Sequence, residues 1–430
     1  MEGGYFCKKK YFFSFFFVRK YHIRDIKKKE RNGLMIKTSD FKTKTMCVDR
    51  KNPITDGDWL VAMDVGYSGV KGMSPNKVYC FPAYAKKSTG QMISLGKDDG
   101  SGIQYKDANT GTVWLVGEAG YDSLDTSDTK DSVNALFGRN RYFSEMFLVI
   151  ARVGIAIGMI ENEYGNSLGK KLTIQTGLPP AYVKADTPLI KEALSGVHDF
   201  SVKIGNSKWI NFNFTLSESD IKVIPQPMGT LMSVSSLMDG TPVPEAAKYF
   251  KKKVLIFDGG FGTLDDFDIS GGRVVNAETF DDLGMKRVMK ETTDRIFEIY
   301  HTEIPIVAMQ KYLGDGFIRS FNRKKHATTQ EPFADILEKA SKEICHEALA
   351  RMDNIYNSFI NHDYFIITGG TGEAWYPMIK DYFKDMSTLK IVPGNQNDNL
   401  PYTFSNVRGY YIQALMHLKA LARINKKAGV

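Results

Sequence analysis

Two stretches of this 430-residue sequence share a pattern of residues that suits phosphate binding. Residues 59–71 (WLVAMDVGYSGVK) begin with an apolar run that ends in Asp64 and continues into a turn rich in glycine and serine. Residues 254–269 (VLIFDGGFGTLDDFDI) begin with a second apolar run, which ends in Asp258 and leads into three glycines. Glycine has no Cβ, so the backbone N–H groups of such a turn can approach a phosphate closely. A carboxylate that ends the strand can hold Mg²⁺ through the water molecules that this ion retains.

Either stretch alone is weak evidence, because Asp-Gly-Gly also forms ordinary hairpin turns. The pattern recurs, however, after about 190 residues. This repetition indicates two related half-domains that each present a loop to one shared cleft.

A third stretch, residues 364–375 (YFIITGGTGEAW), is an apolar strand followed by a glycine turn and a helical segment. Such a strand-to-helix turn suits the close approach of a nucleoside or a phosphate. It lacks the GxGxxG pattern, and no acidic residue follows at the distance that a dinucleotide site requires. The stretch therefore predicts a mononucleotide contact and no dinucleotide site.

The three stretches together resemble motifs of the actin-like ATPase superfamily. Residues 64–71 (DVGYSGVK) and 258–265 (DGGFGTLD) are similar to its two phosphate motifs, and residues 368–373 (TGGTGE) are similar to its adenosine motif. Three further segments are similar to those of bacterial plasmid-segregation actins of the ParM/StbA type: residues 174–179 (IQTGLP), 221–227 (IKVIPQP) and 404–410 (FSNVRGY). The matches run in family order from about residue 60 to residue 421.

The resemblance implies an α/β fold of the actin-like, ribonuclease H-like type, with duplicated domains around a central nucleotide cleft. It divides the chain into domain I (residues 57–225) and domain II (residues 226–403), with the closing helix of residues 404–430 packed back on domain I. Residues 1–56 are expected to be a basic, aromatic and poorly ordered N-terminal extension.

The resemblance also implies a function. We expect an ATPase that polymerises head-to-tail and segregates plasmid DNA through an adaptor protein bound to the plasmid centromere. ATP, with GTP as the alternative, and Mg²⁺ are the expected cofactors, and the cytoplasm is the expected compartment. A cell-shape filament or a sugar-kinase-type phosphotransferase on the same fold is the alternative. A chaperone of this superfamily needs a peptide-binding domain after the ATPase, and the matches leave no room for one.

Three residues are the catalytic candidates. Asp64 and Asp258 are expected to hold Mg²⁺ through water. Gln226 follows the strand predicted over residues 221–224, and the resemblance places it at the γ-phosphate, where relatives of the ParM type carry glutamate and actin carries glutamine. A glutamine cannot take a proton at neutral pH, but it can hold a water molecule in line for attack. Without the resemblance, the better interpretation of Gln226 is a polar turn residue between two prolines.

The remaining candidates are nucleotide contacts, and several have an ordinary structural alternative. Lys71 is as well explained by a solvated strand end, and Lys342 and Glu343, expected near the ribose, by a solvated helix face. Asp265 and Asp268 alternate along a strand as on a solvated face, so no role is assigned to them. The candidates are Gly66, Ser68, Lys71, Gly259, Gly260, Gly262, Thr263, Lys342, Glu343, Gly369, Gly370, Thr371 and Gly372.

The charge distribution argues against a protein whose folded body binds nucleic acid directly. The net charge is +8, but residues 1–51 carry 15 Lys or Arg and 5 Asp or Glu, so the remaining residues are close to neutral. No domain-wide basic surface follows from this distribution. The four cysteines are far apart and have no metal-type spacing, which favours reduced thiols.

Two apolar segments raise the question of a membrane. Residues 11–18 (YFFSFFFV) are flanked by lysines and arginine but are too short to span a bilayer and lack a signal-peptide cleavage site. We expect this region to be a loosely ordered extension, or to precede a start at Met35 or Met46; a weak membrane- or DNA-binding tail is the alternative. Residues 144–160 are interrupted by Glu145 and Arg152, which favours a buried helix. No membrane contact is expected.

Overall fold

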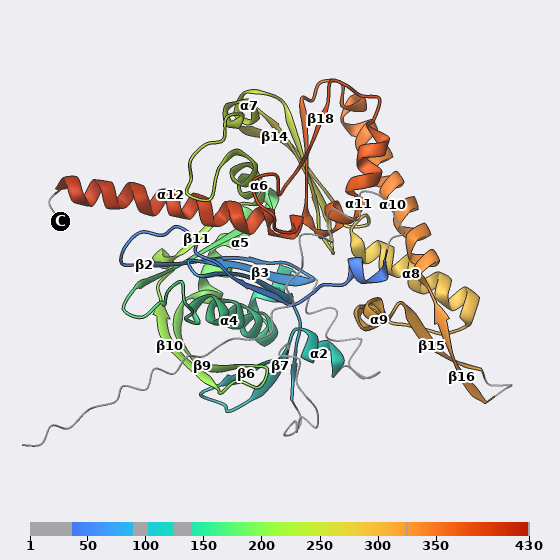
Figure 1. Ribbon diagram of the computed structural model, residues 1–430, viewed down its shortest axis with the longest axis horizontal. Helices are drawn as coiled ribbons and strands as arrows, with labels where there is room; N and C mark the ends of the chain where they lie inside the picture. Colours follow the sequence, from blue (N-terminus) through green and yellow to red (C-terminus); the bar gives the residue numbers. More distant parts are fainter. Residues whose placement is uncertain (1–36, 89–101, 124–138, 323–325, 429–430) are drawn as a thin grey trace, which may run out of the picture. The chain divides into compact units, whose positions relative to one another are not determined.

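The sheet that carries Asp64 has six strands in the order β1-β4-β3-β2-β8-β11, in a computed structural model that describes residues 37–88, 102–123, 139–322 and 326–428 (Figure 1). Its strands are β1 (Met46–Asp49), β2 (Asp58–Val65), β3 (Gly69–Ser74), β4 (Lys77–Pro82), β8 (Lys171–Leu178) and β11 (Ile221–Pro225). Strands β2, β3 and β4 pair antiparallel, whereas β8 and β11 add in parallel beside β2.

The sheet that carries Asp258 repeats this arrangement. Its order is β14-β13-β12-β17-β18, with β12 (Val254–Gly259), β13 (Leu264–Ser270), β14 (Arg273–Phe280), β17 (Tyr364–Thr368) and β18 (Lys390–Pro393). Strands β12, β13 and β14 pair antiparallel, and β17 and β18 add in parallel beside β12. With β1 set aside, the two sheets have the same strand succession. The predicted duplicated α/β fold is confirmed, and we refer below to the first and the second half by these sheets.

The central strand of the first sheet is buried on both faces. Along β2, Val61 and Met63 pack in the core that contains α4 (Glu145–Met159) and α5 (Pro180–Leu194). The alternate residues Leu60 and Ala62 pack against α12 (Ser405–Ala428) on the opposite face. Successive side chains of a strand point to opposite faces, so a continuous apolar run is what a strand between two helical layers requires.

The second sheet is covered in the same manner. Leu255 and Phe257 of β12 belong to the core formed with α8 (Met285–Tyr300), α10 (Ala334–Ile355) and α11 (Gly369–Tyr382). Val254 and Ile256 pack on the other face against α6 (Gln226–Ser235). Each sheet therefore lies between two layers of helices.

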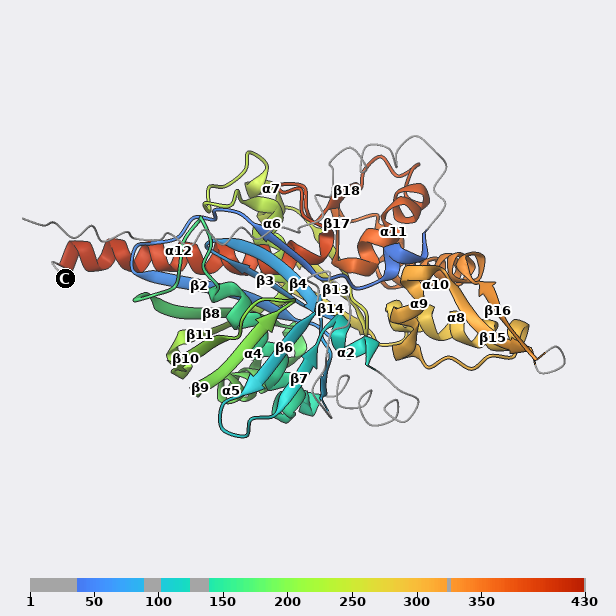
Figure 2. The same cartoon turned by 60° about the horizontal axis from the view of Figure 1, so that its bottom comes forward.

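Two helices pack on the sheet that they do not follow. Helix α6 follows β11 of the first sheet, but its apolar residues join the core of the second sheet. Helix α12 follows the second sheet, but its apolar residues join the core of the first. The two helices are in contact and lie side by side in both views (Figures 1 and 2). Residues 35–430 form one unit, so the predicted domain boundaries near residues 225 and 403 stay a prediction.

Each half carries additional elements beyond its central sheet. The first half has a five-stranded sheet in the order β10-β9-β6-β7-β5, built from β5 (Ala85–Lys87), β6 (Ile103–Asp107), β7 (Val113–Val116), β9 (Gly196–Ile204) and β10 (Ile210–Leu216), with α2 (Glu118–Asp122) beside it. The second half has α7 (Ala246–Lys251), η4 (Ile306–Ala308), α9 (Met309–Asp315) and the hairpin of β15 (Phe317–Asn322) and β16 (Ala327–Pro332).

The helix predicted over residues 144–160 is α4. Ser144 caps its first turn by accepting a hydrogen bond from the N–H of Phe147, as an N-cap serine does. Most of the helix is buried in the first core, as predicted. Among the helices in the described ranges, none has the length and apolar character needed to cross a membrane.

The predicted N-terminal extension is wrong for its last residues. The 3₁₀-helix η1 (Thr38–Phe41) places Phe41 in the core of the second half. A few residues later, β1 pairs with β4 at the edge of the first sheet. We call residues 38–49 the strap, because they contact both halves. A four-residue strand among lysines has too few alternations to be recognised from the sequence. Residues 1–36, where the aromatic run lies, are outside the described residues.

Candidate functional site

Two β-hairpins with the same register form the centre of the candidate site. In the first hairpin, β2 and β3, Asp64 is paired across the strands with Lys71. In the second hairpin, β12 and β13, Asp258 is paired with Asp265. The two aspartates therefore occupy equivalent positions, each at the end of the central strand of its sheet, as the sequence pattern predicts.

The glycine-rich turns of both hairpins are closed by their own backbone. The N–H of Gly66 donates to the carbonyl of Gly69 over 3.1 Å, and the N–H of Gly260 donates to the carbonyl of Thr263 over 2.9 Å. The sequence predicted that N–H groups of these turns bind a phosphate, but these two N–H groups form the hydrogen bonds that close the turns. The absence of a Cβ at both positions still permits close approach of a ligand.

The third glycine-rich segment lies directly against the second hairpin. The hydroxyl of Thr371 donates to the carbonyl of Gly260 over 2.7 Å. Gly369 has φ of 78°, and a Cβ there would lie 2.2 Å from the carbonyl oxygen of Gly259, so both its conformation and its surroundings require glycine. A Cβ on Gly370 would meet nothing within 4 Å. The chain thus has free space at Gly370, next to the second hairpin.

The tips of the two hairpins also touch each other. A Cβ on Gly262 in the second hairpin would lie 2.7 Å from the ring of Tyr67 in the first. Arg141 also contacts that ring, with its guanidinium 4.8 Å from the ring centroid. The same guanidinium donates a hydrogen bond to the carbonyl of Val65 over 2.7 Å. All three glycine-rich segments, which are far apart in the sequence, therefore meet at one place.

The two candidate carboxylates, Asp64 and Asp258, have different electrostatic environments. Asp64 is buried and forms an ion pair with Lys71 over 3.3 Å. Asp258 is buried, and its Oδ2 accepts a hydrogen bond of 2.7 Å from the side-chain amide of Asn406. Burial raises the pKa of Asp258 to about 7; the Asn406 bond opposes this shift, and the charges of Asp265 and Asp64 add to it. Asp258 thus lacks the compensating cation that Asp64 has at the equivalent position.

The interpretation of Asp265 and Asp268 as a solvated face is wrong. Both are buried, because β13 lies between two layers of structure. Asp265 accepts hydrogen bonds from the hydroxyls of Thr279, over 2.6 Å, and Thr263, over 2.8 Å. Asp268 forms an ion pair with Lys253 over 3.3 Å. Burial raises the pKa of Asp265, so this residue is a second carboxyl group whose charge is costly in the absence of a cation.

Gln226 is the first residue of α6, at the junction with β11. Its Oε1 atom is buried and has no hydrogen-bond partner among the described residues. An unsatisfied buried amide oxygen is costly, and such atoms in a folded protein often await a water molecule or a ligand group. The predicted role of Gln226 rests on this unpartnered oxygen and stays a prediction.

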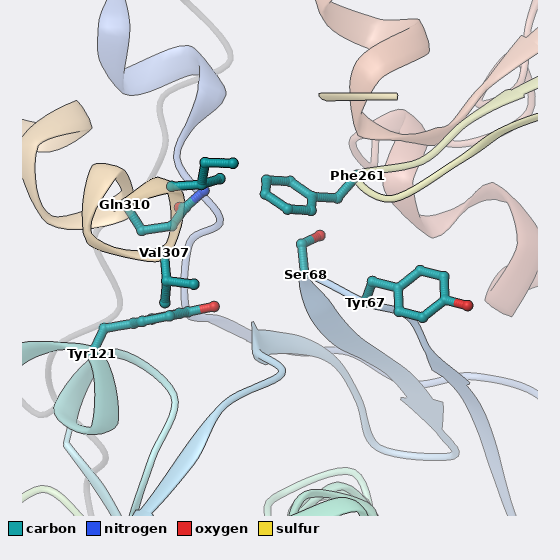
Figure 3. Close-up of a pocket in the computed structure, with 7 residues that line it drawn as sticks. Tyr67, Ser68, Tyr121, Phe261, Val307 and Gln310 are labelled. Carbon is teal, nitrogen blue, oxygen red and sulfur yellow. The ribbon is translucent and has the colours of Figure 1, made fainter. Parts of the chain in front are cut away.

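A small pocket opens at the tips of the two hairpins. Figure 3 shows Tyr67, Ser68 and Phe261 from the hairpins on one side, with Tyr121, Val307 and Gln310 on the other. The pocket is mostly apolar, and neither Asp64 nor Asp258 is among its lining residues. The contacts among the three glycine-rich segments therefore define the candidate site. Ser68 is the predicted site residue that also lines this pocket.

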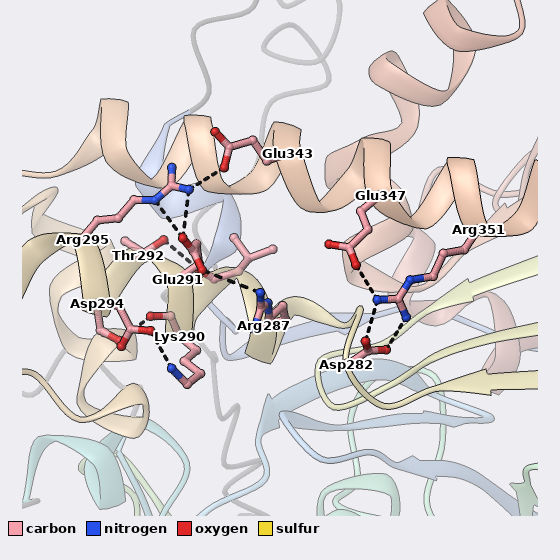
Figure 4. Close-up of polar contacts among 12 residues, drawn as sticks. Asp282, Arg287, Lys290, Glu291, Thr292, Asp294, Arg295, Glu343, Glu347 and Arg351 are labelled. Carbon is pink, nitrogen blue, oxygen red and sulfur yellow. Dashed lines mark hydrogen bonds and ion pairs between the residues drawn. The ribbon is translucent and has the colours of Figure 1, made fainter.

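Lys342 and Glu343 lie on an exposed face of α10 and are engaged in ion pairs. Lys342 pairs with Glu338 over 2.6 Å. Glu343 pairs with Arg295 of α8, which also binds Glu291 over 2.9 Å (Figure 4). Hydrogen bonding to Arg295 lowers the pKa of Glu343. The proposed contact of both residues with a ribose stays a prediction.

The closing helix α12 supplies two site residues that sequence analysis did not assign. Asn406 binds Asp258, as described above. Tyr410 is fully buried, and its hydroxyl has no hydrogen-bond partner among the described residues. Burial raises the pKa of Tyr410, and the charges of Asp64 and Asp258 raise it further. Both residues lie in the FSNVRGY segment, which the family resemblance marked without giving its residues a role.

The residues present fit a nucleotide bound with a magnesium ion. The glycines leave room for close approach, the Gln226 oxygen has no hydrogen-bond partner among the described residues, and Asp258 and Asp265 are two buried carboxyl groups whose pKa values are raised. No cluster of three or more metal-ligating side chains occurs in the described part of the chain. A cation here must therefore keep most of its water, as Mg²⁺ does.

Comparisons with known proteins agree with this fold. Residues 62–229 match the family described as actin like proteins N terminal domain. Among solved structures, the chain is similar to a 15-stranded ParM filament from Clostridium botulinum, with 18% identity, a TM-score of 0.61, and coverage of 84% of this chain and 99% of that one. No curated protein matches the sequence.

Two further solved structures extend the likeness. The actin-like protein Alp7A has 14% identity and a TM-score of 0.60 over 86% of this chain and 99% of its own. An archaeal actin homologue, Ta0583, solved in complex with ADP, has 15% identity and a TM-score of 0.55 over 83% of this chain and 99% of its own. The chain therefore has the actin-like fold, with ParM-type proteins among its structural relatives, as the sequence predicts.

Proposed function

We propose that this chain, which has the actin-like fold, is an ATPase whose nucleotide cycle is coupled to its assembly into head-to-tail filaments. The observation that carries the proposal is the convergence of three glycine-rich segments on two buried carboxylates from equivalent strand ends. Duplicated hairpins of this kind can hold the phosphates between them, while the third segment leaves space for the nucleoside.

The division of labour among the residues follows from their environments. Asp64 and Asp258 hold the water shell of Mg²⁺, and the ion supplies charge stabilisation to the phosphates when it is bound. Lys71 balances the charge of Asp64 and lies beside the first turn. Gln226 accepts a hydrogen bond from the attacking water through its unpartnered Oε1 and orients it without taking its proton.

The filament part of the proposal is supported by the likeness to a ParM filament. A head-to-tail interface that does not close into a ring continues as a helical filament. In this proposal the filament segregates plasmid DNA through a DNA-binding adaptor, which agrees with the near-neutral charge of the residues after 51.

The first test measures pelleting and phosphate release with MgATP and, in parallel, with MgGTP. Gln226→Ala is expected to pellet like the unmodified chain while releasing phosphate about 100-fold more slowly, since a water-positioning group contributes on that order. Gln413→Ala, which removes a half-buried amide on α12, is the matched control and is expected to behave like the unmodified chain.

Two results contradict the proposal. If the chain never pellets and consumes ATP only when a small metabolite is added, it is a phosphotransferase on the same fold. If it pellets but Gln226→Ala releases phosphate at the normal rate, the filament stands and Gln226 loses its assigned role.

A further inference from the structure

The crossing of α6 and α12 is closer than side chains normally permit. A Cβ on Gly409 of α12 would lie 1.7 Å from the carbonyl oxygen of Gly229 in α6. The two backbones are therefore in direct contact, and the ring of Tyr410 packs against Gly229 as well. Such a crossing has little freedom to slide, because any displacement forces backbone atoms together or opens a cavity.

Next to this contact, a short chain of buried hydrogen bonds runs from α6 to the second hairpin. The hydroxyl of Thr230 in α6 donates to Oδ1 of Asn406 in α12 over 2.6 Å. The amide nitrogen of Asn406 then donates to Oδ2 of Asp258 over 2.7 Å. All three residues are buried. Because the Thr230 hydroxyl occupies the amide oxygen, the amide nitrogen is the group that faces Asp258.

This chain of bonds begins on the helix that carries Gln226. Thr230 follows Gln226 by four residues in α6, a spacing that places two side chains on the same face of a helix. The bonds thus connect the helix of the unpartnered Gln226 oxygen to Asp258. The two groups come from segments about 30 residues apart, and Asn406 joins them from a third segment.

We propose that Asn406 is a positioning residue, which fixes the Asp258 carboxylate relative to the helix that carries Gln226. The inference rests on the proposed ATPase function, since it concerns the geometry between the magnesium-holding carboxylate and the attacking water. Removal of the amide leaves Asp258 without the hydrogen bond that holds Oδ2 and uncouples it from Thr230. Partners that orient metal-holding groups typically change metal affinity or activity by about 10- to 100-fold when removed.

The test compares phosphate release per filled site with nucleotide affinity in three variants. Asn406→Ala is expected to lower kcat by about 10- to 100-fold with a smaller change in the Kd of ATP measured without Mg²⁺. Thr230→Val, which keeps the side-chain shape, is expected to lower kcat by about fivefold, the effect of one hydrogen bond. Thr230→Ser keeps the hydroxyl and is expected to restore the rate. Gln413→Ala is the control on α12.

A second measurement does not depend on hydrolysis. Melting temperatures of Thr230→Val, Asn406→Ala and the double variant are compared in the absence of nucleotide. Since the two residues share one hydrogen bond, the double variant is expected to melt no lower than Asn406→Ala alone. If the decreases in melting temperature of the two single variants add up in the double variant, the proposed connection between Thr230 and Asn406 is wrong, whatever the catalytic result.

These measurements separate the two proposals. If the unmodified chain releases no phosphate but the melting temperatures are non-additive, the ATPase proposal fails and the hydrogen-bonded connection stands. If the unmodified chain is active and Asn406→Ala, although folded, has a normal kcat, the positioning role is wrong. A lower melting temperature with an unchanged kcat also overturns it, because that result describes a purely structural residue.

Discussion

The two hairpins of the site share a backbone but differ in charge. Opposite Asp64 the first hairpin has Lys71, and opposite Asp258 the second has Asp265. The first carboxylate is therefore compensated inside the protein, whereas burial and a like charge raise the pKa of the second to about 7. The duplicated fold provides two equivalent positions, and the residue opposite each carboxylate gives that position a different charge environment.

The two halves also differ in the turn that follows the parallel strand beside the central strand of each sheet. Strand β8 ends at Leu178 and leads through Pro179 into α5, whereas β17 ends at Thr368 and α11 begins directly with two glycines. A Cβ on Gly370 would meet nothing within 4 Å, so the second turn leaves open space there. In the proposed function, the first half thus provides a self-neutralised loop, and the second provides the carboxylate that requires a cation and the space for the nucleoside.

The comparison is tested directly by removing the cation of the first hairpin. Lys71→Met leaves Asp64 buried without its partner and is expected to lower the free energy of unfolding by about 3 kcal/mol at pH 8. Denaturant unfolding measures this loss. The double variant Asp64→Asn/Lys71→Met, which buries no charge, is expected to regain most of it. A loss of less than about 1 kcal/mol in the single variant means that Lys71 is not the compensating group.

The second hairpin is expected to respond to pH instead. Because its pKa rises from 3.8 to about 7, folded Asp258 keeps a proton that the unfolded chain releases between these values. Its contribution to stability is therefore complete below pH 4 and lost as the pH rises to 7. Asp258→Asn is expected to gain up to about 4 kcal/mol relative to the unmodified chain over this interval.

The measurement is the difference in unfolding free energy between the two chains at pH 4, 5.5 and 7.5. Taking the difference removes the contributions of carboxylates elsewhere, such as Asp282 and Asp363, whose pKa values are lowered. Asp385→Asn, at an exposed position, is the control. A difference that does not change with pH contradicts the charge assignment for Asp258.

Adding Mg²⁺ without nucleotide is expected to have a smaller effect on the free energy of unfolding, and that effect depends on the second hairpin. At pH 8, Mg²⁺ at ten times its Kd is expected to stabilise the unmodified chain by about 1.4 kcal/mol, and Asp258→Asn is expected to abolish this effect. The melting temperature with and without Mg²⁺ measures it, with Ca²⁺ as a comparison ion. Equal stabilisation of Asp258→Asn places the ion elsewhere.

The smallest effect is expected at the turn after β17. Gly370→Ala is expected to change the free energy of unfolding by no more than about 0.5–1 kcal/mol, and to stabilise if it changes it at all. The position is helical and open, and alanine restricts the unfolded chain. Nucleotide affinity is expected to fall, because the methyl group occupies the space beside the second hairpin. Unchanged affinity removes Gly370 from the site.

The sequence was sufficient for the features that depend on local pattern. Apolar runs ending in aspartate placed the hairpins of β2 and β12, and their repetition predicted the duplicated sheets. These predictions succeed because central strands buried on both faces are continuous apolar runs, and because hairpin turns need glycine.

Features that depend on distant pairing were not predictable. Asn406 binds Asp258 across 148 residues, and a single asparagine in a helix carries no signal of its partner. Asp265 and Asp268 are three residues apart and so point to opposite faces of β13, and only the layers that cover both faces make them buried. The use of the Gly66 and Gly260 N–H groups inside their turns depends likewise on hairpin geometry that glycine content does not specify.

The strap limits how far the two halves can separate. Phe41 is anchored in one core and β1 in the other sheet, and the five-residue path from Phe41 to Met46 reaches at most roughly 17 Å when fully extended. Once this length is taken up, further opening must extract Phe41, at a cost of about 1.5–3 kcal/mol, or peel β1 from β4. In the proposed nucleotide cycle, exchange that requires wide opening is therefore expected to be slowed by this tether, and shortening the tether is a means of adjusting the exchange rate.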